Sequence, residues 1–183
     1  DRFYLYDNES DDDFKSVLAP FLSARVRGSG APLVELIPWP GYFQQNAIYD
    51  DCLRRARGQV EWVAFIDDDE FLHVADGSSL GAFLAPFTEQ AGVAVCWQLY
   101  GSSHQLYAGD EWVIRRFTRR AAAPDQHVKC IVRPLAVTRA LVGGHQFETT
   151  GASVVDENLQ PMSAPLASQP TAQRVRLNHY LIK

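Results

Sequence analysis

The chain has 183 residues, which is the size of one ordinary domain. It is 46% hydrophobic and 21% charged, with a formal net charge of -5. This composition is typical of a globular protein and argues against one that neutralises the phosphates of a nucleic acid. No apolar run approaches the roughly 20 residues that span a bilayer, and residues 1–10 lack the pattern of a signal peptide. We therefore expect a cytoplasmic protein without a transmembrane segment, with peripheral attachment to a membrane left open.

The three cysteines, Cys52, Cys96 and Cys130, are far apart in sequence, and none forms a C-x-x-C pair. This spacing is unlike that of a zinc knuckle or a thioredoxin-like site. The odd count and the missing secretory signal predict buried free thiols in a reducing compartment. Abundant alanine and arginine with little lysine point to a GC-rich bacterial source.

In the first half of the chain, short apolar runs alternate with segments of helical periodicity. Strands are predicted over residues 3–6, 33–37 and 61–66, and helices over residues 14–22 and 42–57. Ser10 or Asp11 is the expected N-cap of the first helix, and Gly58 the expected end of the second. The order β-α-β-α-β predicts a parallel, doubly wound sheet. The chain enters its first strand almost directly, which is typical of a fragment without its first element.

Beyond residue 76 the pattern changes to a mixed second half. A helix that begins at Ser78 or Ser79 and ends at about residue 87 is followed by strands over residues 92–99, 112–117 and 129–133. Residues 160–173 are rich in Pro, Ala, Ser and Gln and predict a mobile loop. A last strand is predicted over residues 174–181.

Four consecutive acids, residues 67–70, follow the apolar run of residues 61–66. In an open α/β sheet, ligands bind beyond the carboxyl ends of the strands. Asp67 and Asp69 would point to the same side of an extended segment, and Glu70 would point away from Asp69. Clustered carboxylates repel one another unless a cation offsets them, and oxygen ligands select Mg²⁺, Mn²⁺ or Ca²⁺. The alternative is a solvated acidic loop, but the position after a buried strand favours a functional site.

Asp7 ends the first apolar run in the same way. If the two strands are parallel neighbours, Asp7 lies at the same rim as Asp67 and could accept hydrogen bonds from a ribose or a base N–H. The alternative is a turn followed by a helix cap, which would also account for Asn8 and Ser10.

Among the histidines, His179 has the strongest claim to a functional role. It follows the predicted mobile loop and precedes Lys183 near the end of the chain, and an imidazole with a lysine suits a metal-bound diphosphate. A lone histidine is more often a structural residue. The other histidines have weaker claims: His73, His104, His127 and His145.

These residues lie in an ordered set of motifs: YLYDNESDDD, QNAIYDDCL, EWVAFIDDDEFL, GSSH, VIRRF, KCIVRP and HYLIK. In this order the motifs resemble glycosyltransferase family 92 and, more widely, the nucleotide-sugar transferases of GT-A fold, including family 2. The resemblance runs from residue 2 to the last residue. It implies one domain with a GT-A-like, Rossmann-like α/β fold, a doubly wound mixed sheet flanked by helices that lacks its first strand. Residues 1–76 would then form a nucleotide-binding half and residues 77–183 an acceptor half.

The resemblance also implies roles for single residues. Asp67 and Asp69 match the D-x-D motif that holds Mn²⁺ or Mg²⁺ on the donor diphosphate, and His179 matches the C-terminal histidine that completes the metal or diphosphate site. Asp7 matches the position that binds uracil or ribose, and residues 160–173 match a lid over the donor. The residues expected to bind the donor are Asp7, Asn8, Asn46, Asp67, His179 and Lys183. No clear match to the Glu-Asp catalytic-base motif is present, and the candidates by distance are Asp110 and Glu111.

The sequence therefore predicts a metal-dependent glycosyltransferase. An acceptor hydroxyl would attack the anomeric carbon of a nucleotide-diphosphate sugar, with a carboxylate base and with inversion. A UDP-sugar is the expected donor, with galactose as the family default, and a carbohydrate or glycoconjugate is the expected acceptor. The alternative is a non-catalytic metal- or sugar-binding module; a metal-dependent phosphohydrolase would need more dispersed ligands than this sequence offers. Trp97, Tyr107 and Trp112 could stack on an acceptor sugar, but aromatic residues of this kind more often lie buried.

Overall fold

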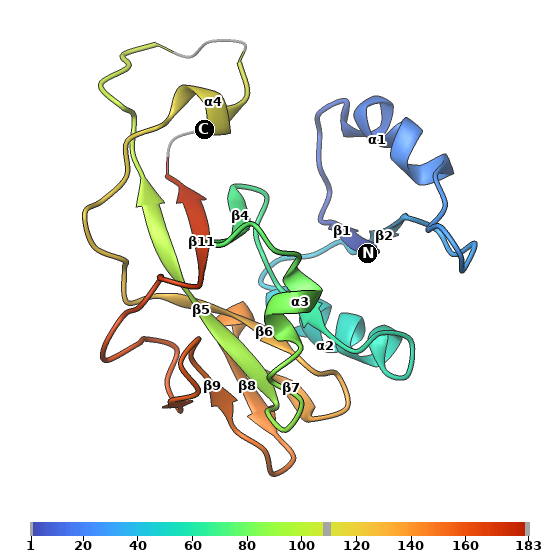
Figure 1. Cartoon of the computed structure of the whole chain (residues 1–183). Coiled ribbons are helices and arrows are strands. Elements are labelled where there is room, and N and C mark those ends of the chain that lie inside the picture. The colour runs from blue at the N-terminus through green and yellow to red at the C-terminus, as the bar shows by residue number, and fades with distance from the viewer. Residues whose placement is uncertain (1, 108–110, 182–183) are drawn as a thin grey trace.

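The computed structural model describes residues 2–107 and 111–181. Two of the predicted site residues, Asp110 and Lys183, lie outside this range. The chain forms a mixed α/β structure with a seven-stranded sheet, a parallel strand pair, a β-hairpin, and the helices and loops that connect them (Figure 1). The mixed α/β class predicted from the sequence is thus confirmed, whereas the GT-A-like topology stays a prediction.

The first β-α-β unit is a parallel strand pair, as predicted. Strands β1 (Phe3–Asp7) and β2 (Val34–Pro38) are connected by helix α1 (Phe14–Ser23). The N-cap prediction of Ser10 or Asp11 is wrong: the helix begins after Asp13, whose side chain makes no capping hydrogen bond. The backbone N–H of Ser10 instead donates to Asp7 Oδ1 at 3.0 Å, which closes a turn before the helix begins.

The main sheet has β5 (Gly92–Tyr100) at its centre (Figure 1). It pairs antiparallel with β6 (Val128–Val132) and parallel with β9 (Val154–Val155) and β11 (Val175–Tyr180). Strand β4 (Glu70–Val74) extends the sheet beyond β11, β10 (Pro161–Met162) beyond β9, and β3 (Val63–Ala64) beyond β6. The predicted strands at residues 92–99, 129–133 and 174–181 are confirmed.

The expected single parallel sheet through all three N-terminal strands is wrong for the described residues. Strand β3 covers only Val63–Ala64 of the predicted residues 61–66, and it pairs antiparallel with β6 instead of joining β1 and β2. The chain leaves the extended conformation after β3, because a turn forms in which the Glu70 N–H donates to the Asp67 carbonyl at 3.2 Å.

Helices cover both faces of the sheet. Helix α2 (Gln45–Ala56) ends before Gly58, which has a φ of 72°, as the sequence predicts. Helix α3 (Leu80–Leu84) is capped by Ser79, whose hydroxyl accepts from the Ala82 N–H, but it ends before residue 87. The predicted strand at 112–117 is wrong: Val113–Arg116 forms the short helix α4, because the N–H groups of residues 115–117 bond locally to the carbonyls of residues 112 and 113.

A hairpin that the sequence analysis missed packs against α2. It consists of β7 (Val137–Val142) and β8 (Gln146–Thr149), joined by the 3-10 turn η1 (Gly143–His145). Alternate residues of β5 point to two core clusters. Ala94 and Cys96 pack with residues of α2 and the hairpin, and Val93 and Val95 pack with residues of α3. Cys52, Cys96 and Cys130 are buried free thiols, as expected.

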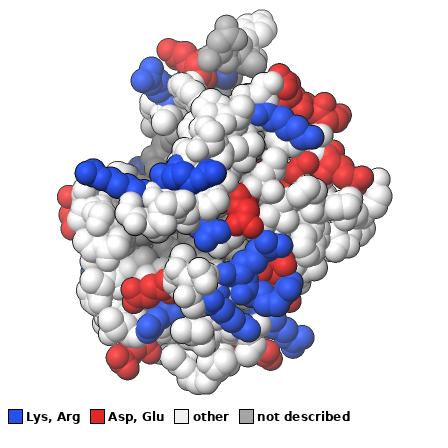
Figure 2. Space-filling view, turned by 90° about the vertical axis from the view of Figure 1, so that its right-hand side faces the viewer, with Lys and Arg blue, Asp and Glu red and all other residues white. Residues whose placement is uncertain are grey.

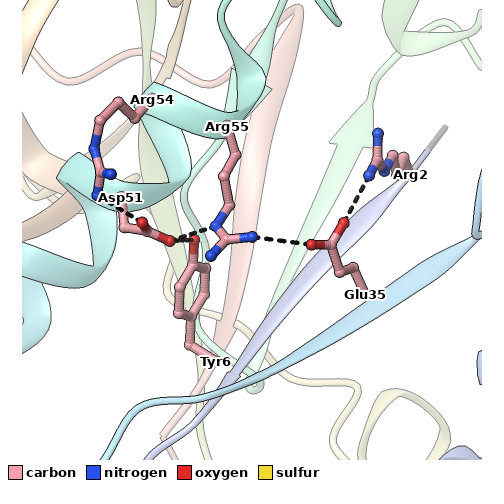
Figure 3. A network of polar contacts seen from close by, with 6 residues as sticks. All are labelled: Arg2, Tyr6, Glu35, Asp51, Arg54 and Arg55. Carbon is pink, nitrogen blue, oxygen red and sulfur yellow. Dashed lines mark hydrogen bonds and ion pairs between the residues drawn. The ribbon is translucent and has the colours of Figure 1, made fainter.

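A polar network ties the β1–β2 pair to helix α2 (Figure 3). Its centre is Asp51, whose carboxylate accepts hydrogen bonds from Tyr6 Oη at 2.8 Å, Arg54 at 2.6 Å and Arg55 at 2.6 Å. Arg55 also reaches Glu35 at 3.1 Å. Asp51 is 4% exposed, so its charge depends on these donors. Burial opposes ionisation of this carboxyl, but the hydrogen bonds from Arg55 and Tyr6 outweigh it and hold its pKa below the usual value.

The segment at residues 160–173 has more order than its composition predicts. Strand β10 pairs with β9, the Ala167 N–H donates to the Gln126 carbonyl at 2.7 Å, and the Thr171 hydroxyl donates to Glu157. Glu157 is 1% exposed and also accepts the backbone N–H groups of residues 173, 174 and 175, each at 2.8 Å. This carboxylate therefore fixes the position at which β11 begins. Movement of residues 160–173 stays a prediction.

Basic and acidic side chains are interspersed on the face shown in Figure 2. None of the described helices is long and apolar enough to cross a membrane.

Asp51→Asn should lower the free energy of unfolding by about 2 kcal/mol, because the remaining donors lose a charged acceptor in a buried position. Arg54→Gln is the control: this side chain is 68% exposed, so its loss should cost at most about 1 kcal/mol. Urea denaturation measures both. The pKa of Asp51 is lower in the folded than in the unfolded chain, so its stabilising contribution is complete above its ordinary pKa of 3.8 and is lost as the pH falls below that value. Equal losses in the two variants would contradict the central role of Asp51.

Glu157→Gln should destabilise the chain by about 2 kcal/mol, because a single amide oxygen replaces two carboxylate oxygens that accept four hydrogen bonds. Glu89 is exposed, and Glu89→Gln is a matched control that should leave stability unchanged. Thermal unfolding followed by circular dichroism compares the two. If the Glu157 variant melts with the control, the carboxylate does not anchor β11.

Candidate functional site

The acidic run forms a turn that feeds strand β4. Residues 68 and 69 lie in the turn, and Glu70 is the first residue of β4. The Glu70 carboxylate folds back and accepts the backbone N–H of Asp67 at 2.8 Å. Glu70 is 3% exposed, and burial raises the pKa of its carboxyl to about 7, against the opposing effect of the Asp67 N–H and Lys129. It thus holds the turn in shape. The prediction that its side chain points away from that of Asp69 assumed an extended segment, and a turn at residues 68 and 69 takes its place.

Lys129 of strand β6 contacts the same turn. Its Nζ donates to Asp67 Oδ2 at 2.9 Å and lies 3.8 Å from Glu70 Oε2. The Lys129 side chain is 2% exposed, whereas that of Asp67 is 44% exposed. The first acid of the D-x-D motif is therefore paired with a buried ammonium group.

Asp69 meets His179 across the β4–β11 pairing. In this antiparallel register Glu70 is opposite His179, and the Tyr180 N–H donates to the Asp69 carbonyl at 3.0 Å. Asp69 Oδ2 and His179 Nε2 are 3.6 Å apart, and their side chains are 16% and 14% exposed. Two residues that are far apart in sequence, and that the sequence analysis assigned to one metal site, thus lie side by side.

The arrangement fits a cation that also takes ligands from elsewhere. Two ligands at right angles around Mg²⁺, each about 2.1 Å from the metal, are about 3 Å apart, close to the Asp69–His179 separation. Carboxylate oxygen and imidazole nitrogen both suit Mn²⁺. Among the residues that the structure describes, however, no group of three or more His, Cys, Asp or Glu side chains is gathered to hold a metal. The third predicted ligand, Asp67, faces Lys129.

Three histidines surround Trp97 next to this pair. The Trp97 ring centroid lies 4.3 Å from that of His179, 4.9 Å from His127 and 5.6 Å from His145. Both His127 and His179 are close enough to pack on the indole ring, and Trp97 is partly buried against a core cluster. His145 Nδ1 contacts the Val128 carbonyl at 2.6 Å, and burial lowers the pKa of its imidazole.

Two features here were not singled out from the sequence: Lys129, and the pairing of Asp125 with His127, a histidine given only a weak claim. Asp125 Oδ1 lies 2.6 Å from His127 Nδ1 and also accepts the His127 backbone N–H at 2.9 Å. The hydrogen bond from that N–H and the His127 ring keep the pKa of Asp125 low against burial. A carboxylate that orients an imidazole is a common base arrangement. The D-x-H spacing was visible in the sequence, and so was a lysine at the start of the strand predicted over residues 129–133.

The other predicted donor-site residues lie near the end of β1 and on α2, where they make structural contacts. Asp7 closes the turn with Ser10, and the hydrogen bond from the Ser10 N–H lowers the pKa of its carboxyl. Asn8 donates to the carbonyls of Trp39 and Gly41. Asn46 donates to the Leu141 carbonyl and accepts the Gly143 N–H, so it joins α2 to the hairpin.

A pocket of about 460 Å³ lies between the end of β1, the start of α2 and the residue before the acidic turn. Among its lining residues are Tyr4, Tyr6, Asn8, Phe43, Tyr49 and Ile66. Phe43 is fully exposed and has a φ of 56°, and the neighbouring Tyr42 is 88% exposed. The pocket thus has an aromatic, polar-edged lining next to Asp67.

The catalytic-base candidates are not tested by this geometry. Asp110 lies outside the described residues, as does Lys183. Glu111 is exposed in the segment before α4, and Trp112 beside it is 76% exposed. Tyr107 is 86% exposed, so Tyr107 and Trp112 are not buried aromatics.

The sequence profile of glycosyltransferase family 92 matches residues 1–163. A glycosyltransferase family 92 protein of Oryza sativa subsp. japonica is 34% identical over 144 residues, which cover 77% of this chain and 24% of that protein. A family 92 protein of Ricinus communis is 32% identical over 146 residues, which cover 78% of this chain and 25% of that protein. A galactan β-1,4-galactosyltransferase of Arabidopsis thaliana is 30% identical over 102 residues, 51% of this chain and 20% of that protein.

The chain spans about a quarter of the length of the curated family 92 relatives that it matches. These relatives are plant proteins, so they lend no support to the bacterial source suggested by the composition. The family match covers the acidic turn, Lys129 and the Asp125–His127 pair, and it confirms the resemblance seen in the motifs. The chain belongs to glycosyltransferase family 92.

Proposed function

We propose that this chain carries the donor and metal site of a metal-dependent glycosyltransferase that uses a UDP-sugar. The observation that carries the proposal is the contact between Asp69 and His179, which brings two suitable ligands together at the ends of β11 and of the acidic turn. Family membership supports the same activity class.

The cofactor in this proposal is Mn²⁺ or Mg²⁺, held by Asp69 and His179. When bound, such a cation supplies positive charge against the diphosphate of the leaving group. Because two ligands are gathered among the residues that the structure describes, the remaining ligands would be diphosphate oxygens and water. The proposed site therefore binds metal and nucleotide jointly.

The nucleoside would occupy the pocket at the end of β1. Phe43 offers an exposed aromatic face for the base, and Asn8 and the turn at Asp7 offer polar groups for base or ribose. Asp67 lies directly after Ile66 of this pocket, so the diphosphate would extend from the pocket toward Asp69. Asn46 and Lys183 remain predicted contributors to donor binding.

In the reaction, the acceptor hydroxyl oxygen forms a bond to the anomeric carbon while the bond from that carbon to the diphosphate breaks. The hydroxyl proton passes to a base. Asp110 and Glu111 remain candidates, and His127 is a further one, because Asp125 orients its imidazole next to Trp97 and hence near His179. Attack opposite the leaving group would invert the anomeric carbon.

The acceptor is proposed to be a carbohydrate or glycoconjugate. Relatives named as galactan β-1,4-galactosyltransferases suggest UDP-galactose as the donor and a galactan-like chain as the acceptor. The exposed Tyr107 and Trp112 offer faces that could stack on sugar rings.

Thermal shift with Mn²⁺, UDP and both tests joint binding. We expect the combined ligands to raise the melting temperature by more than the sum of the separate shifts, because metal and diphosphate share one site. Asp69→Asn should remove this excess, whereas Asp68→Asn, which removes the same charge from an exposed neighbour, should keep it. Additive shifts in the wild type would contradict a shared site and favour the alternative, a non-catalytic binding module.

His127→Gln should lower kcat for transfer from UDP-galactose while leaving the dissociation constant of UDP with Mn²⁺ unchanged. The change removes a base without removing a proposed donor ligand, and general-base catalysis typically contributes a factor of about 10² or more. Steady-state kinetics and calorimetry separate the two quantities. An unchanged kcat would show that His127 is not the base and would leave Asp110 and Glu111 as the candidates.

A further inference from the structure

Lys129 is a buried charge that the proposed chemistry does not use. All five residues of β6 are buried, and the Lys129 side chain is 2% exposed. A lysine in such a position is costly unless its ammonium group is paired. Its partners are Asp67 at 2.9 Å and Glu70 at 3.8 Å, both in the acidic turn.

The space for the Lys129 side chain is built into the fold. Gly144 is buried in the turn between β7 and β8, and a Cβ atom at this position would lie 3.2 Å from Lys129 Cδ and 3.0 Å from Phe65 Cβ. A larger residue would therefore press on the lysine stem and on the chain that leads to the acidic turn. The lack of a side chain at Gly144 leaves room for the Lys129 stem, which places the ammonium group next to Asp67.

The Lys129 ammonium group pairs with Oδ2 of Asp67 and sets a positive charge beside any cation that would use this carboxylate as a ligand. Asp67 Oδ2 is bound to the ammonium group, and the Asp67 backbone is held by the Glu70 carboxylate at 2.8 Å. A divalent cation at Asp69 and His179 would thus find two ligands and a nearby positive charge. A diphosphate would add the missing oxygen ligands and would offset the positive charge of Lys129 with its own negative charge.

We propose that Lys129 is an internal counter-cation that keeps Asp67 out of the metal's ligand set and so makes cation binding depend on the donor diphosphate. The inference rests on the proposed metal role of Asp69 and His179. It assigns Lys129 as a positioning residue, and it gives the two aspartates of the motif different roles.

Electron paramagnetic resonance measures free Mn²⁺ and gives its dissociation constant with and without UDP. The wild type should bind Mn²⁺ weakly alone and more tightly with UDP. Lys129→Met should bind Mn²⁺ alone roughly tenfold more tightly than the wild type, because a third charged oxygen ligand becomes available. Lys15→Met is the matched control: it makes the same charge change on an exposed part of α1 and should leave the affinity unchanged.

The double variant Lys129→Met with Asp67→Asn decides whether the gain acts through Asp67. We expect it to return to the wild-type affinity for Mn²⁺ alone. A gain that persists in the double variant, or no gain in Lys129→Met, would overturn the proposal. Should Lys129→Met not fold, Asp67→Asn alone serves, since this side chain is 44% exposed. It should then leave the affinity for Mn²⁺ alone unchanged, and a tenfold loss would show that Asp67 is a ligand.

The wild-type titration separates this inference from the proposed function. If UDP does not tighten Mn²⁺ binding in the wild type, the joint metal and donor site itself is wrong. If UDP tightens Mn²⁺ binding but Lys129→Met leaves the affinity for Mn²⁺ alone unchanged, only the role of Lys129 is wrong.

Discussion

The pairing of β11 with both β4 and β5 is the constraint on which the site depends. It places the last strand of the described chain between an antiparallel neighbour that begins at the acidic turn and a parallel neighbour at the centre of the sheet. The Glu157 carboxylate accepts the backbone N–H groups of Arg174 and Val175 and so fixes the start of β11. The hydrogen bond from the Tyr180 N–H to the Asp69 carbonyl fixes the end of the strand. His179 can therefore meet Asp69 in one register only, since a shift by one residue would turn its side chain to the other face.

The acids of the turn differ in burial and in the groups that they contact, although they are consecutive in sequence. Glu70 is buried and shapes the turn, Asp67 is paired with Lys129, and Asp69 contacts His179. Placing several negative charges within one short turn is unfavourable in isolation, so the protein distributes positive and neutral partners among them. We infer that this distribution leaves a site that a metal–nucleotide complex completes.

The sequence predicted the elements better than their pairing. Long apolar runs such as residues 92–99 identified the central strands, because a strand buried on both faces is apolar at nearly every position. The separation of β1 and β2 from the main sheet was not predictable, since strand order depends on long-range contacts. The hairpin β7–β8 was missed even though the Gly143–Gly144 pair is a turn signal. In the site, Asp69 and His179 were brought together as predicted, but Lys129 was overlooked because a lysine beside an apolar run suggests an exposed strand end.

Anomalous X-ray scattering from crystals grown with Mn²⁺ and UDP is the most direct test of the proposed joint site. We predict a manganese peak in coordination contact with the Asp69 carboxylate and the His179 imidazole, with the diphosphate on the same ion and Asp67 still bound to Lys129. A manganese ion that does not contact both Asp69 and His179, or UDP bound without a metal in another part of the chain, would contradict it.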